Sequence, residues 1–152
     1  MNARPANGFV LRDATAQDFP AIRQLIHEVG INPMGLDWRR FLVAVDANQS
    51  LLGCGQLKPH GEDVLELASI AVISERRQQG IARAIIEQLL SRAPRPLYLI
   101  CRSPLGTFYE RWGFQALDLP DMPAYFRRLA RLARAFAPLL GEGDGMLVME
   151  LK

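Results

Sequence analysis

The sequence predicts an α+β fold, with a mixed, mostly antiparallel central sheet flanked by helices on both faces. Short apolar runs separated by turn residues recur along the first half of the chain, which is typical of antiparallel strands. A helical pattern joins two later apolar runs, 64–72 and 97–101, and such a crossover makes its two strands parallel. The chain has 152 residues, 49% apolar and 22% charged, so we expect one globular domain over 1–152.

The N-terminal segment is predicted to form a strand over 9–12 and then a helix. Thr15 can cap this helix, and Gly30 is expected to end it. The helix has apolar residues three and four positions apart, namely Phe19, Ile22, Leu25, Ile26 and Val29. A short helix is predicted over 36–41.

Three strands are expected to follow as an antiparallel meander. They are predicted over 42–45, 51–57 and 64–72, with a hairpin loop at 46–49 and a turn at 59–63. Beyond this meander, two prolines, Pro94 and Pro96, are expected to end a helix over 83–93. The remaining predicted elements are a buried strand over 97–101, a short helix over 105–112 and strands over 114–117 and 146–151.

A basic amphipathic helix is predicted as an insertion over about 120–140. Its apolar residues recur at helical spacing: Phe126, Leu129, Ala133, Phe136 and Leu140. The other faces carry arginines at 127, 128, 131 and 134. Three interpretations stay open: a solvated face on a helix that covers the sheet, a lip over a substrate groove, or a membrane or nucleic-acid surface.

Charge and cysteine content narrow the classes of function. A net charge of +2 is too small to indicate nucleic-acid binding. Cys54 and Cys101 lack a CxxC spacing and are predicted to be buried free thiols, while His27 and His60 are predicted to be ordinary surface residues, so no metal is expected. No apolar run approaches the ~20 residues that cross a bilayer, and residues 1–8 do not resemble a signal peptide, so we expect a cytoplasmic protein with no membrane association.

The strongest functional signal is a strand, a glycine-containing turn and a helix start within 70–83. The strand ends Ile70-Ala71-Val72, and the turn reads Arg77-Gln78-Gln79-Gly80-Ile81-Ala82 before Arg83. Such a helix start offers unpaired backbone N–H groups to an anion, and a glycine removes the Cβ that would block close approach. A P-loop is disfavoured because no Gly-Lys-Ser/Thr follows, and a dinucleotide fold because only one glycine of its fingerprint is present.

Together with Tyr109-Glu110-Arg111-Trp112-Gly113-Phe114, this segment resembles the GNAT N-acetyltransferase superfamily. Arg77, Gly80 and Ala82 match its Q/R-x-x-G-x-G/A signature, and 109–114 match its Y-x-x-x-G-F motif. The resemblance implies a GNAT-like acyl-CoA N-acyltransferase fold that moves an acetyl group from acetyl-CoA directly to a primary amine of a small molecule or protein. The acetyl-CoA contacts that it implies are Ile70, Ala71, Val72, Arg77, Gln78, Gln79, Gly80, Ile81, Ala82, Arg83 and Tyr109.

The resemblance also implies catalytic roles. Tyr109 would protonate the CoA thiolate as it leaves, although a tyrosine packed on the sheet is the alternative. Glu66 stands where some relatives carry a glutamate base, six positions before the terminal Val72; a half-exposed strand carboxylate is the alternative. The Val72 N–H would polarise the carbonyl. Ser69 would order a water molecule or be an ordinary strand serine.

Two positions depart from the family pattern, and other functions stay open. Arg102 and Leu105 stand where many relatives carry asparagine and alanine, so a cofactor contact from that asparagine is in doubt. No cysteine or serine lies in a nucleophile motif, which favours direct transfer. The alternatives are a non-catalytic CoA-binding sensor and a nucleic-acid-associated module. The amine is not readable from the sequence, and a monomer or a homodimer is expected.

Overall fold

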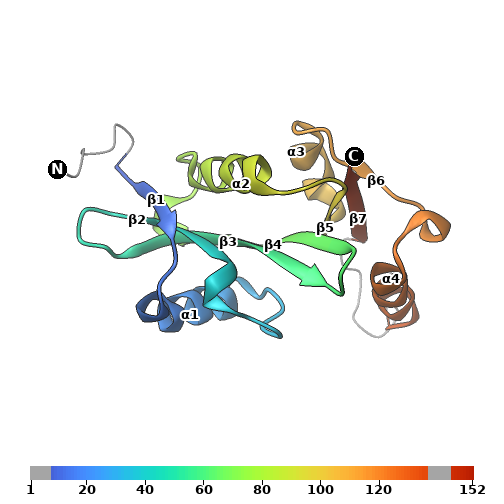
Figure 1. Cartoon of the computed structure of the whole chain (residues 1–152), viewed down its shortest axis with the longest axis horizontal. Coiled ribbons are helices and arrows are strands. Elements are labelled where there is room, and N and C mark those ends of the chain that lie inside the picture. Colours follow the sequence, from blue (N-terminus) through green and yellow to red (C-terminus); the bar gives the residue numbers. More distant parts are fainter. Residues whose placement is uncertain (1–7, 137–144) are drawn as a thin grey trace. The chain divides into compact units, whose positions relative to one another are not determined.

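The computed structural model describes residues 8–136 and 145–152 (Figure 1). Its seven strands pair in the order β1-β2-β3-β4-β5-β7-β6. β4 and β5 run parallel, with Glu66 opposite Tyr98, whereas the β1–β2, β2–β3, β5–β7 and β6–β7 pairs are antiparallel. This pairing confirms the predicted α+β fold with a mixed, mostly antiparallel sheet and a parallel crossover.

The chain forms two compact units. The first consists of Met1–Lys58 and Leu67–Ala93, and the second of Pro59–Glu66 and Pro94–Lys152. Strand β4 (Val64–Val72) contributes residues to both units.

In the first unit, β1 (Val10–Asp13), β2 (Phe41–Val45) and most of β3 (Leu51–His60) form the sheet together with most of β4. The last two residues of β3 belong to the second unit. The predicted helix over 36–41 is instead a single 3-10 turn, Trp38–Arg40, in which the Arg39 backbone N–H donates to the carboxylate of Asp37 at 3.0 Å. β3 is longer than predicted because its strand conformation continues to the turn at 61–63.

Helices α1 (Phe19–Val29) and α2 (Ile81–Arg92) cover opposite faces of the first unit's sheet (Figure 1). α1 buries Ile22, Leu25 and Ile26 against β2, and Gly30 ends it with φ 74°. α2 lies unusually close to β3. A Cβ built on Gly55 would lie 2.8 Å from Ile85 Cγ2, so only glycine fits beneath the helix.

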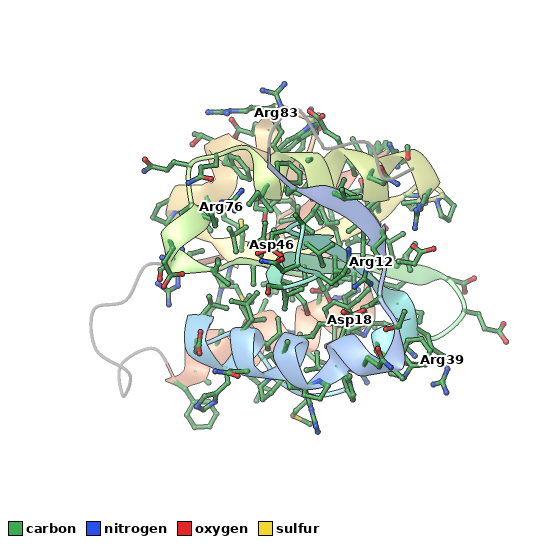
Figure 2. The ribbon with its side chains drawn as sticks, turned by 90° about the vertical axis from the view of Figure 1, so that its left-hand side faces the viewer. Arg12, Asp18, Arg39, Asp46, Arg76 and Arg83 are labelled. Atoms are coloured by element: carbon green, nitrogen blue, oxygen red, sulfur yellow. The ribbon has the colours of Figure 1, made fainter. Side chains whose placement is uncertain are left out.

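An ion pair fixes the start of α1 to β1. The guanidinium of Arg12 donates two hydrogen bonds to the Asp18 carboxylate, at 2.8 and 3.0 Å (Figure 2). The Thr15 backbone N–H also donates to Asp18, at 2.7 Å, so Thr15 marks the start of the helical segment as predicted. These bonds hold the pKa of Asp18 below its usual range, and the bond from Arg12 is the largest cause.

The second unit is built on β5 (Leu97–Arg102), β7 (Met146–Leu151) and the short β6 (Gln115–Ala116). Helix α3 (Gly106–Glu110) brings Gly106 against Leu147. Helix α4 (Ala124–Phe136) packs Phe126 and Ala130 on a cluster that includes Val148. Because Leu147 and Val148 are neighbours in one strand, the two helices cover opposite faces of this unit's sheet.

Helix α4 is the predicted amphipathic insertion, and it begins later than expected. A 3-10 turn at Leu119–Asp121 precedes it, and the part of the prediction that covers 137–140 lies outside the described residues. Its buried stripe contains Phe126 and Ala130, whereas Phe136 is half exposed rather than part of the packed face. The packing agrees with a helix that covers the sheet.

Candidate functional site

Strand β4 contains an irregularity at Ser69, whose φ is 59°. Its side chain is buried and its Oγ accepts a hydrogen bond from Gln56 Nε2 at 2.8 Å, while Gln56 is fully buried. A serine in the left-handed region is strained unless its surroundings hold it there, and Gln56 supplies part of that support. Ser69 is therefore not an ordinary strand serine.

The irregularity changes which face each later β4 residue occupies. Ile70 reaches toward α2, since its Cδ1 would lie 2.6 Å from a Cβ on Gly55. Ala71 belongs to the core cluster beneath α1. A left-handed residue interrupts the two-residue alternation, so counting in twos along β4 does not assign residues on opposite sides of Ser69 to the same face.

The turn between β4 and α2 has an open, exposed backbone. Residues 77–80 are all exposed, and Gln78 and Gly80 have φ of 61° and 83°. A Cβ on Gly80 would meet no protein atom within 4 Å, so glycine is needed for the backbone conformation and not to relieve crowding within the protein. The same openness leaves room for a ligand over the turn.

The start of α2 presents backbone donors. Its first helical hydrogen bond runs from the Ala84 N–H to the Gly80 carbonyl at 3.0 Å, so the N–H groups of Ile81, Ala82 and Arg83 precede the helical ladder. The Ile81 side chain is buried and anchors the turn, while Gly80 offers no capping side chain. The positive end of the helix dipole adds attraction for an anion.

The arginines of this segment bond mainly within it. Arg76 Nε donates to Gln79 Oε1 at 2.7 Å, Arg77 Nε to the Val72 carbonyl at 3.4 Å and Arg83 Nε to Glu87 Oε1 at 2.9 Å. Arg83 points outward from α2 (Figure 2). Exposed pairs of this kind are weak, so the arginine side chains can change their partners. The donors with a fixed position are the backbone N–H groups.

Glu66 lies in the second unit and is bound to a histidine. Glu66 Oε1 is 2.6 Å from His60 Nε2, and the side chains are only 12% and 8% exposed. The prediction that His60 is an ordinary surface residue is wrong, whereas His27 is exposed as predicted. The sequence contains a signal for this pair. His60 ends β3, and Glu66 is the third residue of β4, which follows after a short turn, so the two residues lie near the same end of neighbouring strands.

Tyr109 is also in the second unit, in a buried aromatic environment. Its ring centroid lies 5.1 Å from that of Phe108, 6.1 Å from Phe114 and 6.3 Å from Trp112. Burial, together with a smaller contribution from Cys101, raises the pKa of Tyr109 to about 12. Its phenol therefore stays protonated at neutral pH. Glu66 pairs with His60, whereas Tyr109 packs among Phe108, Trp112 and Phe114.

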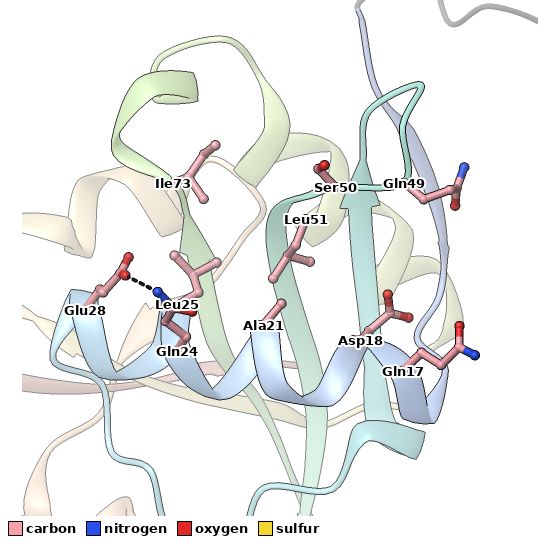
Figure 3. A pocket seen from close by; sticks show the side chains of 10 residues that line it. All are labelled: Gln17, Asp18, Ala21, Gln24, Leu25, Glu28, Gln49, Ser50, Leu51 and Ile73. Atoms are coloured by element: carbon pink, nitrogen blue, oxygen red, sulfur yellow. Dashed lines mark hydrogen bonds between the residues drawn. The ribbon is translucent and has the colours of Figure 1, made fainter.

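A pocket of about 400 Å³ lies elsewhere in the first unit, along α1 and the loop between β2 and β3 (Figure 3). Its polar lining is largely bonded to itself or to nearby residues: Gln24 Nε2 donates to Glu28 Oε1 at 3.0 Å, and Asp18 is paired with Arg12. No predicted site residue lines it. It therefore contains no candidate for acyl-transfer chemistry.

Other features of the described residues bear on the candidate chemistry. Cys54 and Cys101 are buried free cysteines, as predicted. Within 8–136 and 145–152, no group of three or more His, Cys, Asp or Glu is arranged to hold a metal ion. Across those same ranges, no helix combines the length and the apolar character that crossing a membrane requires.

Comparisons with solved structures find the same fold. N-acetylglutamate synthase from Neisseria gonorrhoeae, complexed with coenzyme A and L-arginine, has a TM-score of 0.70 and 21% identity over 92% of this chain. This chain spans only 32% of that longer one. Rv2747 from Mycobacterium tuberculosis, in complex with CoA and NLQ, has a TM-score of 0.71 and 25% identity, covering 93% of this chain and 98% of that one. A GCN5-related N-acetyltransferase from Kribbella flavida has a TM-score of 0.63 and 18% identity, with coverage of 97% and 99%.

No curated protein matches the chain. A family model described as an acetyltransferase (GNAT) domain matches residues 37–116. That range is more than half of the chain, and it includes the β4–α2 turn, Glu66 and Tyr109. The chain belongs to the GNAT acetyltransferase family.

Proposed function

We propose that this chain is an acetyl-CoA-dependent N-acetyltransferase that moves the acetyl group directly to a primary amine of a small molecule or protein. The observation that carries the proposal is the exposed turn before α2, where three N–H groups precede the helical ladder and Gly80 leaves open space. Two of the similar structures, from Neisseria gonorrhoeae and Mycobacterium tuberculosis, are CoA complexes, which supports acetyl-CoA as the donor.

The main chain of residues 77–83 would bind the pyrophosphate. Several donors that converge on one anion suit its two negative charges, and the helix dipole contributes roughly 0.3–1 kcal/mol. The strand end Ile70-Ala71-Val72 would pair with the pantetheine arm, with the Val72 N–H directed at the thioester carbonyl. Gln56 and Ser69 fix the backbone just before this strand end.

Glu66 is the proposed general base. A protonated amine with a pKa of ~10.4 must lose a proton before it can attack a carbonyl. A carboxylate that is mostly shielded from water, and oriented by His60, is suited to accept that proton. Glu66 would thereby generate the neutral nucleophile.

Tyr109 is proposed to donate a hydrogen bond to the departing sulfur. Its pKa of about 12 makes complete transfer of the phenol proton to a thiolate of pKa ~8.5 uphill by roughly 5 kcal/mol. The attacking nitrogen loses a proton as the amide forms, and the departing sulfur gains one. These two proton transfers balance without a net loss of the phenol proton. In that balance Tyr109 stabilises the developing thiolate and remains protonated at the end.

Direct transfer is favoured over an acyl-enzyme. A cysteine nucleophile must ionise, yet burial raises the pKa of Cys54 to about 12 and also raises that of Cys101. Neither thiol is a suitable nucleophile at neutral pH. The amine and acetyl-CoA would therefore bind together before the reaction. A cytoplasmic monomer or homodimer is part of the same proposal.

The proposal also favours an acceptor that bears a carboxylate. Arg128, Arg131 and Arg134 of α4 are exposed, and a guanidinium suits a carboxylate. N-acetylglutamate synthase among the similar structures makes glutamate a reasonable first candidate. Free amino acids and peptides with a free N-terminus belong to this chemical class.

The test is to incubate the protein with acetyl-CoA and a panel of amines. The panel should contain glutamate, glutamine, a peptide with a free N-terminus and a polyamine that lacks a carboxylate. Thiol release and the mass of the product are measured together. An acetylated amine formed in step with CoA supports the proposal. CoA binding without an acetylated product would instead indicate a non-catalytic sensor.

A further inference from the structure

Helix α4 lies outside the residues that the family model matches, yet it contacts the partner of the candidate base. The model ends at residue 116, and α4 covers Ala124–Phe136. Two consecutive α4 residues, Tyr125 and Phe126, pack against the imidazole of His60. His60 in turn binds Glu66. All of these residues belong to the second unit.

The bond between His60 and Glu66 has one chemically sensible direction. Glu66 must be ionised to act as the proposed base, and a carboxylate has only acceptor atoms, so in that state His60 Nε2 donates the hydrogen bond to Glu66 Oε1 at 2.6 Å. Both side chains are largely shielded from water, so little solvent competes for this bond. Such a bond restricts the rotamers of the glutamate and fixes the direction of its carboxylate.

The imidazole is itself held by aromatic contacts. Tyr125 stacks on it with a centroid separation of 3.7 Å and an interplanar angle of 20°. Phe126 meets it edge-on at 5.7 Å and 76°, and Phe126 is fully buried against Tyr98 in the core of this unit. The ring can therefore neither rotate nor move away without disturbing α4.

The Tyr125 phenol is sensitive to the same carboxylate. Burial is the main cause of the raised pKa of Tyr125, and the negative charge of Glu66 is the second. Tyr125 thus contributes a neutral, apolar ring face rather than a competing charge.

We propose that His60 is a positioning residue for Glu66, and that α4 contributes Tyr125 to hold the imidazole in place. This inference rests on the proposed function, in which Glu66 accepts the proton of the amine. Through Tyr125 and His60, the geometry assigns α4 a role in orienting the Glu66 carboxylate. A base that is held in a narrow range of directions is more often placed correctly to accept a proton from the ammonium. The helix is then required for turnover and not only as a cover for the sheet.

Two substitutions of His60 separate its hydrogen bond from its packing. In His60→Phe the ring and its stacking on Tyr125 remain, but the donor is lost. In His60→Gln the side-chain amide can place a donor near the position of Nε2. We expect kcat to fall roughly tenfold to a hundredfold in His60→Phe and to recover most of that loss in His60→Gln. The KM for acetyl-CoA should stay within about twofold in both, since neither substitution touches the β4–α2 turn.

Two substitutions in α4 provide a matched pair. Tyr125→Ala removes the stacked ring, whereas Phe136→Ala removes a half-exposed ring at the other end of the same helix. Tyr125→Ala should lower kcat with little change in the KM for acetyl-CoA, and Phe136→Ala should leave kcat unchanged. Circular dichroism and calorimetric titration with CoA check that each variant is folded and binds the donor.

A double substitution tests whether His60 acts through Glu66. If it does, adding His60→Phe to Glu66→Gln produces no further loss of kcat. If folded His60→Phe keeps the wild-type kcat, the inference is overturned. It is also overturned if the losses of kcat from the two single substitutions are fully additive in the double variant. In both cases the transferase activity of the wild type is unaffected. An inactive wild type overturns the proposed function as well, so the two failures can be distinguished.

Discussion

The Ala84 N–H donates the first hydrogen bond of α2 to the carbonyl of Gly80, at 3.0 Å. This single contact defines where the helical ladder starts and therefore which N–H groups are left for a ligand. Gly80 itself has φ 83° and faces open space. The proposed pyrophosphate site is thus a consequence of one backbone conformation.

Gly80→Ala should weaken CoA binding, and Gly30→Ala is its matched control. Both glycines lie in the left-handed region, with φ of 83° and 74°, and a Cβ on either would meet no protein atom within 4 Å. Each substitution should lower the free energy of unfolding by about 1 kcal/mol. Only Gly80→Ala should raise the Kd for CoA, by tenfold or more, in a calorimetric titration. Equal Kd values in the two variants would contradict a role for this turn.

Tyr109→Phe should lower kcat by roughly tenfold to a hundredfold, because the departing sulfur loses a hydrogen-bond donor. The KM for acetyl-CoA should change little. Tyr98→Phe is a suitable control, since Tyr98 is a buried tyrosine of the same unit whose phenol bonds to Glu150. Steady-state kinetics of both variants provide the measurement. Full activity in Tyr109→Phe would remove the assigned role.

Gly55→Ala should destabilise the first unit. The added Cβ would lie 2.6 Å from Ile70 Cδ1 and 2.8 Å from Ile85 Cγ2, so α2 must move away from β3. Overpacking of this kind lowers the free energy of unfolding by about 1–3 kcal/mol. Urea denaturation measures it, and an unchanged midpoint would show that α2 is not packed closely on β3.

Asp18→Asn should destabilise the protein by about 1–2 kcal/mol at pH 7, because the hydrogen bonds from Arg12 and Thr15 lose a charged acceptor. The pKa of Asp18 is lowered in the folded state, so its stabilising contribution is present above the unfolded pKa of ~3.9 and is lost as pH falls through the folded pKa. The difference between wild type and variant should therefore shrink on acidification. Denaturant unfolding at several pH values tests this, and a constant difference would contradict it.

The elements that the sequence predicted correctly are those with strong local signals. β4 and β7 have the predicted bounds, and Gly30 ends α1 as expected. The turn around Gly80 was also recognisable, because a glycine before an apolar helical pattern has few other uses. One domain over the whole chain stays a prediction, as do the cofactor and catalytic assignments.

The features that the sequence did not reveal depend on contacts between distant residues. Ser69 carries no local preference for the left-handed region, and its bond to Gln56, thirteen positions away, helps to hold it there. For His60 the sequence pattern is misleading, because a single histidine in a polar turn resembles a surface residue. Its burial depends on Tyr125, which comes from a helix beyond the recognised motifs.

Calorimetric titration of the wild-type protein with CoA and with pantetheine, which lacks the pyrophosphate, tests whether the turn before α2 binds the anion. We expect saturable binding of CoA and an affinity for pantetheine at least a hundredfold lower, because the main-chain donors at the start of α2 have no anion to bind in pantetheine. Equal affinities for the two compounds, or no binding of CoA, would contradict it.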